Sequence, residues 1–307
     1  MRTSKSFWRV VLVVCLFAFT SVAVAKPARL TTIDYPGAVH TYALGINPAG
    51  DIVGAYIDTL GREHGFALRN EEFISFDWPG STWTDGYGIN PRGDIVGQYG
   101  WIENGIKTTH GFLLRDGALF PIDVLGQQNT MPFKINPEGV IVGCNHTNLN
   151  AAGAIDISEM YGFTLDAAGA TNQTMVRSMN LGVNPAGDVV GYYFGTPSAI
   201  PSIRAEWSYL IRNGVMTWFQ YPGAFATLAT DISPSGTIVG RYRLQTSATF
   251  HGFVLEDDEF ESFDVPGATQ TFPFSVSATG DIVGYYVVGA GSAAVSHGFL
   301  LSRRGPG

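Results

Sequence analysis

Three consecutive residues, Cys144, Asn145 and His146, bring together the two side-chain types of a thiol nucleophile and its base. Such a dyad requires a thiolate and a second group within hydrogen-bond reach. Consecutive strand residues, however, point to opposite faces of a sheet. Sequence adjacency therefore predicts no catalytic residue here, and Asn145 and His146 remain candidates for ligand binding.

The motifs of common enzyme classes are absent from the sequence. It contains no GxSxG, HExxH, CxxC, Walker or GxGxxG segment and no DxDxDG calcium loop. We therefore predict neither a cofactor nor a metal site. A glycosidase or lyase can still draw its acids from separate segments of a chain. The acids that occupy no repeated position are Asp85, Asp156, Glu159 and Asp231.

These residues lie within a repeated pattern that fills the chain. One copy reads IDYPGA from Ile33, GINPAGDIVGAY from Gly45 and HGFAL from His64. The glycine of the IVG-type segment marks each copy. It stands at Gly54, Gly97, Gly143, Gly191, Gly240 and Gly284. The steps between these glycines, 43 to 49 residues, match the roughly 40–45 residues of a four-stranded propeller blade.

Each repeat predicts four short strands, which we name A to D in chain order. In the first repeat they are Thr41–Asn47, Ile52–Tyr56, Gly65–Leu68 and Phe73–Phe76. Asn-Pro-Ala-Gly-Asp between strands A and B has the residues of a tight hairpin turn.

The repeats are permuted with respect to the chain ends. The last repeat lacks a D strand after Leu301, whereas a surplus D-like segment, Leu30–Asp34, precedes the first A strand. Pairing Leu30–Asp34 with Gly298–Leu301 would close a ring and remove two open sheet edges. We expect an all-β fold, a six-bladed β-propeller of four-stranded blades whose last blade is closed by the N-terminal strand.

The motifs IDxPGA, GINxxGDIVGxY and HGFLL resemble the HAF-type extracellular repeat family of bacteria, from about Leu30 to Leu301. The resemblance implies a secreted repeat protein and transfers no catalytic residue. The fourth copy departs most from the pattern. It lacks the Pro-Gly turn near Thr174 and has Ser208-Tyr209 where Gly-Phe is expected.

Residue types that recur in the same register are expected to serve the architecture. We expect the histidines to support the scaffold rather than a metal, the aspartates to hold the turn before Pro-Gly, and the asparagines to cap the A–B hairpin. The histidines are His64, His110, His251 and His297; the aspartates are Asp34, Asp77, Asp123 and Asp264; the asparagines are Asn47, Asn90, Asn136 and Asn184; and Thr41, Thr84, Thr130, Ser178, Thr227 and Thr271 open the A strands.

Positions that differ among the repeats are the candidates for recognition. The longest B–C segments belong to repeats three and four, and the D–A and B–C loops of a propeller share one rim, where ligands usually enter. Lys134 and Asp231 stand where glycine is commonest, in repeats two apart, so we expect them to approach each other through the channel. The D–A loops end in His40, Trp83, Asn129, Arg177, Ala226 and Gln270. The candidate ligand-binding residues are His40, Trp83, Lys134, Asn145, His146, Arg177 and Asp231.

Residues 1–25 have the pattern of a secretory signal peptide, a basic start, an apolar run and Ala23-Val24-Ala25 before Lys26. We expect residues 26–307 to form a single six-repeat domain, secreted to the exterior or the periplasm, without stable membrane insertion. Loss of three basic residues with the signal changes the net charge from −8 to −11, which disfavours nucleic acid as a partner. Cys144 is then the only cysteine, so no internal disulfide forms.

The sequence thus predicts a secreted, non-catalytic and monomeric binding module without cofactors. Its partner would be a carbohydrate, a peptide or a cell-surface component, bound through one rim of the channel. The alternative is an extracellular polysaccharide-active enzyme, a glycosidase or lyase, that uses acids near the channel. A structural envelope component is a third reading, and the fold alone does not choose among them, since propellers host many functions.

Overall fold

The structure is a computed structural model that describes residues 29–103, 106–146, 157–195 and 206–303. The signal peptide expected over residues 1–25 lies outside the described residues. Two short 3-10 turns, η1 (Ile157–Glu159) and η2 (Gly291–Ala293), accompany the strands. Within the described ranges, no helix has the length and apolar character needed to cross a membrane.

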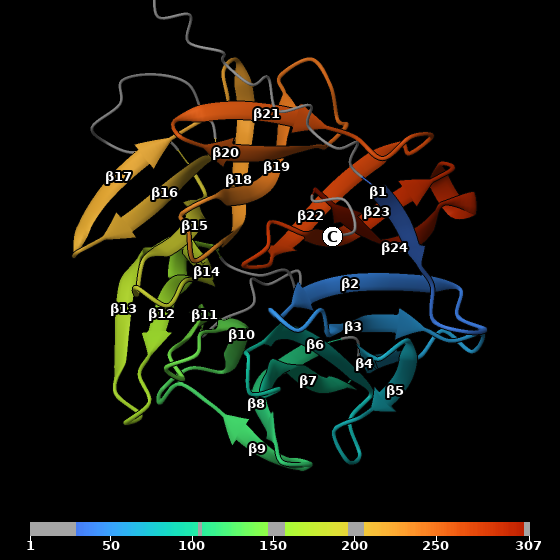
Figure 1. Cartoon of the computed structure of the whole chain (residues 1–307). Helices are drawn as coiled ribbons and strands as arrows, with labels where there is room; N and C mark the ends of the chain where they lie inside the picture. The colour runs from blue at the N-terminus through green and yellow to red at the C-terminus, as the bar shows by residue number, and fades with distance from the viewer. Residues whose placement is uncertain (1–28, 104–105, 147–156, 196–205, 304–307) are drawn as a thin grey trace, which may run out of the picture.

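The strands follow one another along the chain as antiparallel hairpins (Figure 1). Repeat one has β2 (His40–Ile46), β3 (Ile52–Ile57), β4 (Glu63–Arg69) and β5 (Glu72–Phe76). Repeat two has β6 (Trp83–Ile89), β7 (Ile95–Glu103), β8 (Ile106–Arg115) and β9 (Ala118–Ile122). Repeat three has β10 (Asn129–Ile135), β11 (Ile141–His146), β12 (Tyr161–Leu165) and β13 (Thr171–Val176).

The second half of the chain continues in the same order. Repeat four has β14 (Ser178–Val183), β15 (Val189–Tyr193), β16 (Trp207–Arg212) and β17 (Val215–Phe219). Repeat five has β18 (Ala224–Ile232), β19 (Ile238–Leu244), β20 (His251–Glu256) and β21 (Glu259–Phe263). Repeat six has β22 (Gln270–Val276), β23 (Ile282–Val288) and β24 (Val295–Ser302), and is joined by β1 (Arg29–Ile33).

The sheets are arranged in a ring around a central axis, so the chain is an all-β β-propeller with four-stranded blades (Figure 1). Repeats three to six each form a separate four-stranded sheet. Repeats one and two form one eight-stranded sheet, because a parallel pair between Glu63 and Trp83 joins β4 to β6. Six separate four-stranded sheets were expected. The structure instead has four separate four-stranded sheets and this eight-stranded sheet.

The two ends of the described chain meet in one sheet. β1 pairs with β24 in antiparallel register, with Leu30 opposite Leu301 and Ile33 opposite Gly298. Ile33 is buried in the core against the first repeat. The expected closure of the last sheet by the N-terminal strand is confirmed, and Figure 1 shows this blue strand among the red ones.

The recurrent glycine of strand B allows strand A to approach closely. Strand A bulges between Gly86 and Gly88, and a Cβ atom on Gly97 would lie 2.0 Å from the carbonyl oxygen of Asp85 and 2.6 Å from the ring of Phe112. The equivalent glycines of the other repeats would meet a strand A carbonyl oxygen at 1.9 to 2.3 Å. Only glycine fits there, which explains why the IVG segment recurs.

The asparagine of the A–B turn caps its hairpin, as expected. The Asn47 Oδ1 atom accepts hydrogen bonds from the backbone nitrogens of Ala49 and Asp51, at 3.0 and 2.9 Å. Its Nδ2 atom donates to Asp51 and to the carbonyl oxygen of Asn90 in the next repeat. The turn residues thus also tie neighbouring repeats together.

Candidate functional site

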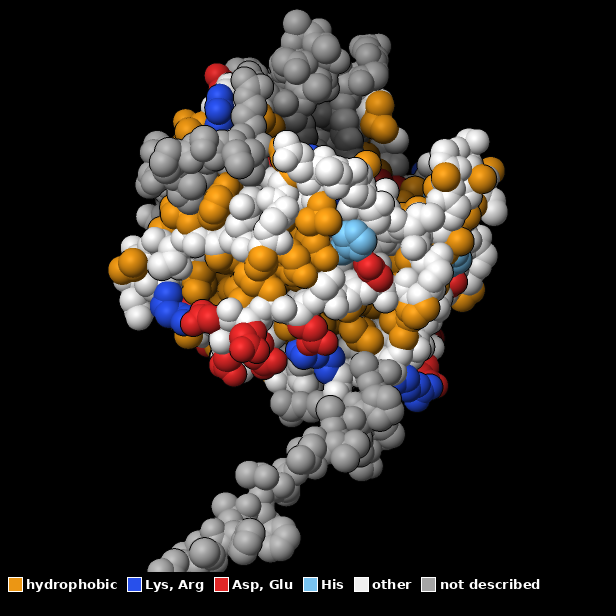
Figure 2. Space-filling view, turned by 90° about the horizontal axis from the view of Figure 1, so that it is seen from above, with side chains coloured by type: hydrophobic (Ala, Val, Ile, Leu, Met, Phe, Trp, Pro, Cys, Tyr) orange, Lys and Arg blue, Asp and Glu red, His pale blue; other side chains and the backbone are white. Residues whose placement is uncertain are grey.

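The repeated histidines and aspartates bind each other. In each case the histidine Nδ1 atom lies 2.8 to 3.0 Å from the aspartate carboxylate of the neighbouring strand or turn. The pairs are His64–Asp77, His110–Asp123, His251–Asp264 and His297–Asp34. Figure 2 shows histidine and acidic side chains side by side on the outside of the ring. The scaffold role expected for the histidines agrees with this geometry.

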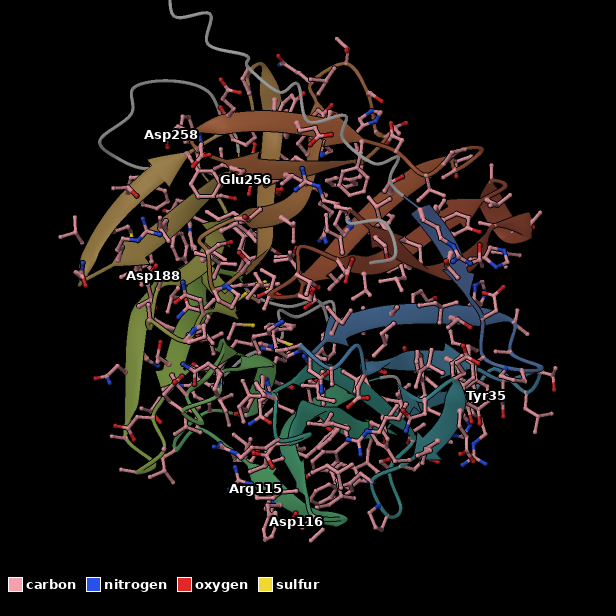
Figure 3. All side chains as sticks on the ribbon, viewed as in Figure 1. Tyr35, Arg115, Asp116, Asp188, Glu256 and Asp258 are labelled. Atoms are coloured by element: carbon pink, nitrogen blue, oxygen red, sulfur yellow. The ribbon has the colours of Figure 1, made fainter. Side chains whose placement is uncertain are left out.

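The turn before Pro-Gly is held by threonine rather than by aspartate. The Thr41 hydroxyl accepts a hydrogen bond of 3.0 Å from the backbone nitrogen of Tyr35, and Thr84, Thr130, Thr227 and Thr271 make the same bond in their own repeats. Tyr35, labelled in Figure 3, stacks on Tyr56 with a ring separation of 3.6 Å. The expectation that the aspartates hold this turn is therefore wrong.

Lys134 and Asp231 meet across the channel, as the repeat register predicts. The Lys134 Nζ atom lies 2.5 Å from the Asp231 carboxylate and 2.6 Å from the Ser275 hydroxyl, which donates to the same carboxylate. The backbone nitrogen of Val276 adds a further bond of 3.0 Å. Asp231 is 0% exposed. This network joins repeats three, five and six and fully engages both charges.

A cavity opens along the axis at the end formed by the A–B turns. Its volume is about 460 Å³, and Lys134 lies among its walls. The other walls are Ile46, Ile89, Ile135, Val183, Ile232 and Val276 with the Asn-Pro segments of the turns. Lys134 thus lies toward this end, whereas the D–A loops lie at the opposite end of the A strands.

The D–A end holds the other predicted residues, but not as one cluster. His40 is half-buried, and its Nδ1 atom accepts a hydrogen bond of 3.1 Å from the backbone nitrogen of Ser296. Trp83 is only 4% exposed, and its ring would touch a Cβ atom on Gly100 at 3.0 Å. Trp83 was predicted as a ligand-binding residue. Its packing against strand β7 leaves little of the ring accessible to a ligand and corrects that prediction.

Arg177 remains exposed at this end. It is the single residue between β13 and β14, and its φ of 63° lies in the left-handed region. Its backbone bonds to Met160 and Phe194 hold this turn where a Pro-Gly segment is missing. The backbone of Arg177, and not its side chain, therefore holds this turn.

Asn145 and His146 are buried at the end of β11. The Asn145 Oδ1 atom accepts a long hydrogen bond of 3.4 Å from Gln173, while its buried Nδ2 atom has no hydrogen-bond partner in the described part of the chain. His146 is 2% exposed and lies 3.4 Å from the amide of Asn129. Burial raises the pKa of the Cys144 thiol. Cys144 packs in an apolar cluster with Met131, an environment that disfavours the reactive thiolate form.

The sequence analysis missed a cluster of arginines and aromatic rings between repeats five and six. The Arg241 guanidinium lies over three phenylalanine rings, at 5.4 Å from Phe272 and 5.6 Å from Phe250 and Phe274. The Arg243 guanidinium lies 4.6 Å from the ring of Phe225 and 5.8 Å from that of Phe250. We call these residues the arginine–aromatic cluster.

One sequence signal could have revealed this cluster. Arg241 directly follows the IVG-type glycine, and the residue type at this position varies among the repeats. Its residues are Ala55, Gln98, Cys144, Tyr192, Arg241 and Tyr285. Gln98 donates to the carbonyl oxygen of Pro132 and Tyr285 packs on Tyr42, so the position faces the next repeat.

Tyrosines and acids accompany the cluster near the channel. Burial raises the pKa of Tyr285, and the positive charge of Arg241 opposes the effect. Burial also raises the pKa of Tyr42, against a hydrogen bond from Ser296, with further upward contributions from the carboxylates of Glu63 and Asp85. The described residues contain no group of three or more His, Cys, Asp or Glu side chains able to hold a metal ion.

Comparison with known proteins supports the fold. The chain matches no family model and no curated protein. TolB from Acinetobacter baumannii is similar in structure, with a TM-score of 0.57 and 13% identity, over 83% of this chain and 64% of TolB, less than two thirds of that protein. A fucose-binding lectin mutant of Aleuria aurantia in complex with Fucα1-6GlcNAc has a TM-score of 0.48 and 9% identity, over 87% of this chain and 97% of the lectin.

A further solved structure is the β-propeller domain of the Trilobed protease from Pyrococcus furiosus. It has a TM-score of 0.47 and 11% identity, over 84% of this chain and 82% of that domain. At 13% identity the similarity to TolB supports the fold alone, and none of these comparisons assigns a ligand.

Proposed function

We propose that the chain is a secreted, non-catalytic β-propeller that binds a carbohydrate, peptide or other surface partner at the D–A end of its channel. One observation carries the proposal. The repeated polar side chains bond within the scaffold, whereas side chains that differ among the repeats, such as Arg177 and Arg241, remain at or near one end of the ring. Groups outside the scaffold are those available for recognition.

The same proposal includes the finer architecture and the location. One residue pair joins the two halves of the eight-stranded sheet, so we count these halves as two blades and the ring as six-bladed. The resemblance to HAF-type extracellular repeats and the N-terminal signal pattern support secretion. The Asp231 carboxylate accepts hydrogen bonds from Lys134, Ser275 and the backbone nitrogen of Val276, so it is engaged in the scaffold. This engagement of an acid near the channel favours binding over catalysis.

The test is a glycan and peptide binding array, run beside hydrolysis and lyase assays on the same polysaccharides. We expect retention without turnover. Arg177→Gly removes the side chain at a backbone conformation that suits glycine, and it should weaken binding without unfolding. Arg92→Ala and Glu138→Ala, in the A–B turns at the opposite end, are the matched controls. Binding lost only in the controls would contradict the proposal.

A polysaccharide-active enzyme is the second candidate, and one observation favours it. The carboxylates of Glu63 and Asp85 both raise the pKa of Tyr42 and of Tyr87, after the larger effect of burial, so both acids lie in the neighbourhood of the same two tyrosines. Turnover in the assays that is abolished by Glu63→Gln would support this function instead.

A further inference from the structure

Arg241 and Arg243 form no salt bridge with an acid of the described residues. The arginines of the strand ends form salt bridges, for example Arg115 with Asp94 and Arg212 with Asp188, and Arg115 and Asp188 are labelled in Figure 3. Arg241 and Arg243 form none of the salt bridges found in the described ranges. Arg29, Arg62 and Arg177 also lack one there, but they are exposed to water.

The two unpaired charges lie close together. Arg241 and Arg243 are two residues apart on β19, so both side chains point to the same face of the sheet. Both guanidinium groups lie within 5.8 Å of the ring of Phe250. Like charges at this spacing in a half-buried site repel each other, since burial weakens the screening by water. An anion between or beside them would remove that repulsion.

The aromatic rings hold the Arg241 guanidinium in a defined orientation. Contacts with Phe250, Phe272 and Phe274 restrict its motion, and cation–π attraction contributes about 0.5–2 kcal/mol at such sites. Its Nε atom is buried and has no hydrogen-bond partner among the described residues. A guanidinium presents a planar fork of N–H donors that matches two oxygens of a carboxylate. The site therefore has the donors for an oxyanion, and the described residues supply no acceptor for the Arg241 Nε atom.

We propose that the arginine–aromatic cluster binds the carboxylate of an acidic saccharide, a uronic acid unit. This inference rests on the proposed function, because it names the ligand class for the same end of the propeller. The chain's net charge of −8 disfavours long polyanions such as nucleic acids, so a short saccharide with few carboxylates suits the site better. The Tyr285 ring stacks on Phe272 at 4.7 Å and supplies a hydroxyl for a sugar hydroxyl group.

The test is calorimetric titration of the whole secreted chain with oligogalacturonate and oligoglucuronate. The same oligosaccharides with their carboxyl groups reduced to alcohols are the neutral controls. We expect binding of a uronate and at least tenfold weaker binding of its reduced form. Arg241→Gln and Arg243→Gln should each weaken uronate binding tenfold or more, whereas Arg92→Gln at the opposite end should leave it within twofold.

A second readout separates a ligand site from a packing role. Arg241 has no salt bridge among the described residues, so Arg241→Met, which keeps the aliphatic stem and loses only the cation–π contacts, should lower the thermal midpoint by no more than a few degrees. A uronate should raise the midpoint of the wild type and not that of Arg241→Met. A large fall in midpoint for Arg241→Met with unchanged uronate binding would overturn the inference.

The remaining outcomes distinguish the two proposals. Retention of neutral glycans with no preference for uronates would overturn the carboxylate site and leave the binding function intact. Preference for sulfated sugars, or for peptides with a free C-terminal carboxylate over their amides, would overturn the uronic acid assignment. Failure to retain any glycan or peptide would overturn the proposed function itself.

Discussion

The histidine–aspartate pairs connect neighbouring elements through half-exposed contacts. His251 lies 2.8 Å from Asp264 and packs on Tyr242, with ring centroids 5.3 Å apart. The histidine side chain is 27% exposed and the aspartate 48%. Water therefore screens the charge interaction, and we expect the hydrogen bond and ring contact to provide most of the stabilisation.

A double-mutant cycle tests this role. His251→Ala should lower the free energy of unfolding by about 1 kcal/mol through the lost hydrogen bond. The coupling with Asp264→Ala should be about 0.5 kcal/mol, as for exposed ion pairs. Urea denaturation measures both. A stoichiometric metal ion released from the wild type, but not from His251→Ala, would show that the histidine is a ligand instead.

The buried Lys134–Asp231 pair should respond much more strongly. Lys134→Met leaves the Asp231 carboxylate buried without its cation, so we expect a loss of about 3 kcal/mol or more in the free energy of unfolding. Adding Asp231→Asn removes the unpaired charge and keeps an acceptor for Ser275, so the double variant should recover much of the loss. Urea denaturation gives the values.

A matched control lies in the same repeat. Glu138 is exposed in the A–B turn that follows Lys134, and Glu138→Ala should change the free energy of unfolding by less than about 0.5 kcal/mol. A loss for Lys134→Met as small as that for Glu138→Ala would mean that the ion pair contributes no stability.

At the scale of elements, each A–B hairpin depends on the close approach at the glycine of strand B. Gly97→Ala should destabilise the fold by about 3 kcal/mol or more, because the new methyl group has no room against the carbonyl oxygen of Asp85. Gly80→Ala is the comparison. Gly80 has a φ of 78° and open space around it, so only the conformational cost of about 1–2 kcal/mol applies.

Chemical denaturation of the two glycine variants decides this point. If Gly97→Ala is no worse than Gly80→Ala, strands A and B can separate without loss of packing, and the recurrence of the IVG glycine needs another explanation.

Local sequence patterns predicted the strands and turns well. The features that they did not predict depend on contacts between segments far apart in the sequence. The A–B turn and the four strands of repeat one lie within two residues of their expected bounds, because turn chemistry and alternation are local. The Lys134–Asp231 contact was predictable because equal register places residues at one level of the ring. The burial of Trp83 was not, since register fixes height in the ring but not packing against β7.

The arginine–aromatic cluster was not predicted for the same reason, because it depends on packing between repeats. Arg241 reaches Phe272 and Phe274 of the next repeat, and such a contact depends on how adjacent sheets pack. Likewise, the pair that joins β4 to β6 arises where Glu63 and Trp83 approach each other. A pattern within one repeat contains no information on either approach.

For the whole molecule, stability depends on the pairing of β1 with β24. Deleting residues 26–37 would expose the edge of β24, and we expect aggregation or a fall of several degrees in the thermal midpoint. A peptide of residues 29–34 added in trans should restore the midpoint, whereas a scrambled peptide should not. Monomeric elution with an unchanged melting curve would contradict closure by this strand.

The pairing of β1 with β24 also sets the order of events during synthesis. Residues 29–33 form the first of the described strands to be synthesised, yet their partners at 298–302 form the last of them. The ring therefore cannot close until β24 has been made, and loop-closure entropy grows with the length of the intervening chain. Contacts of such high sequence separation also slow folding. We infer that the nascent chain keeps an unpaired edge strand until β24 has formed. Protection of this edge by a chaperone matters most during that period.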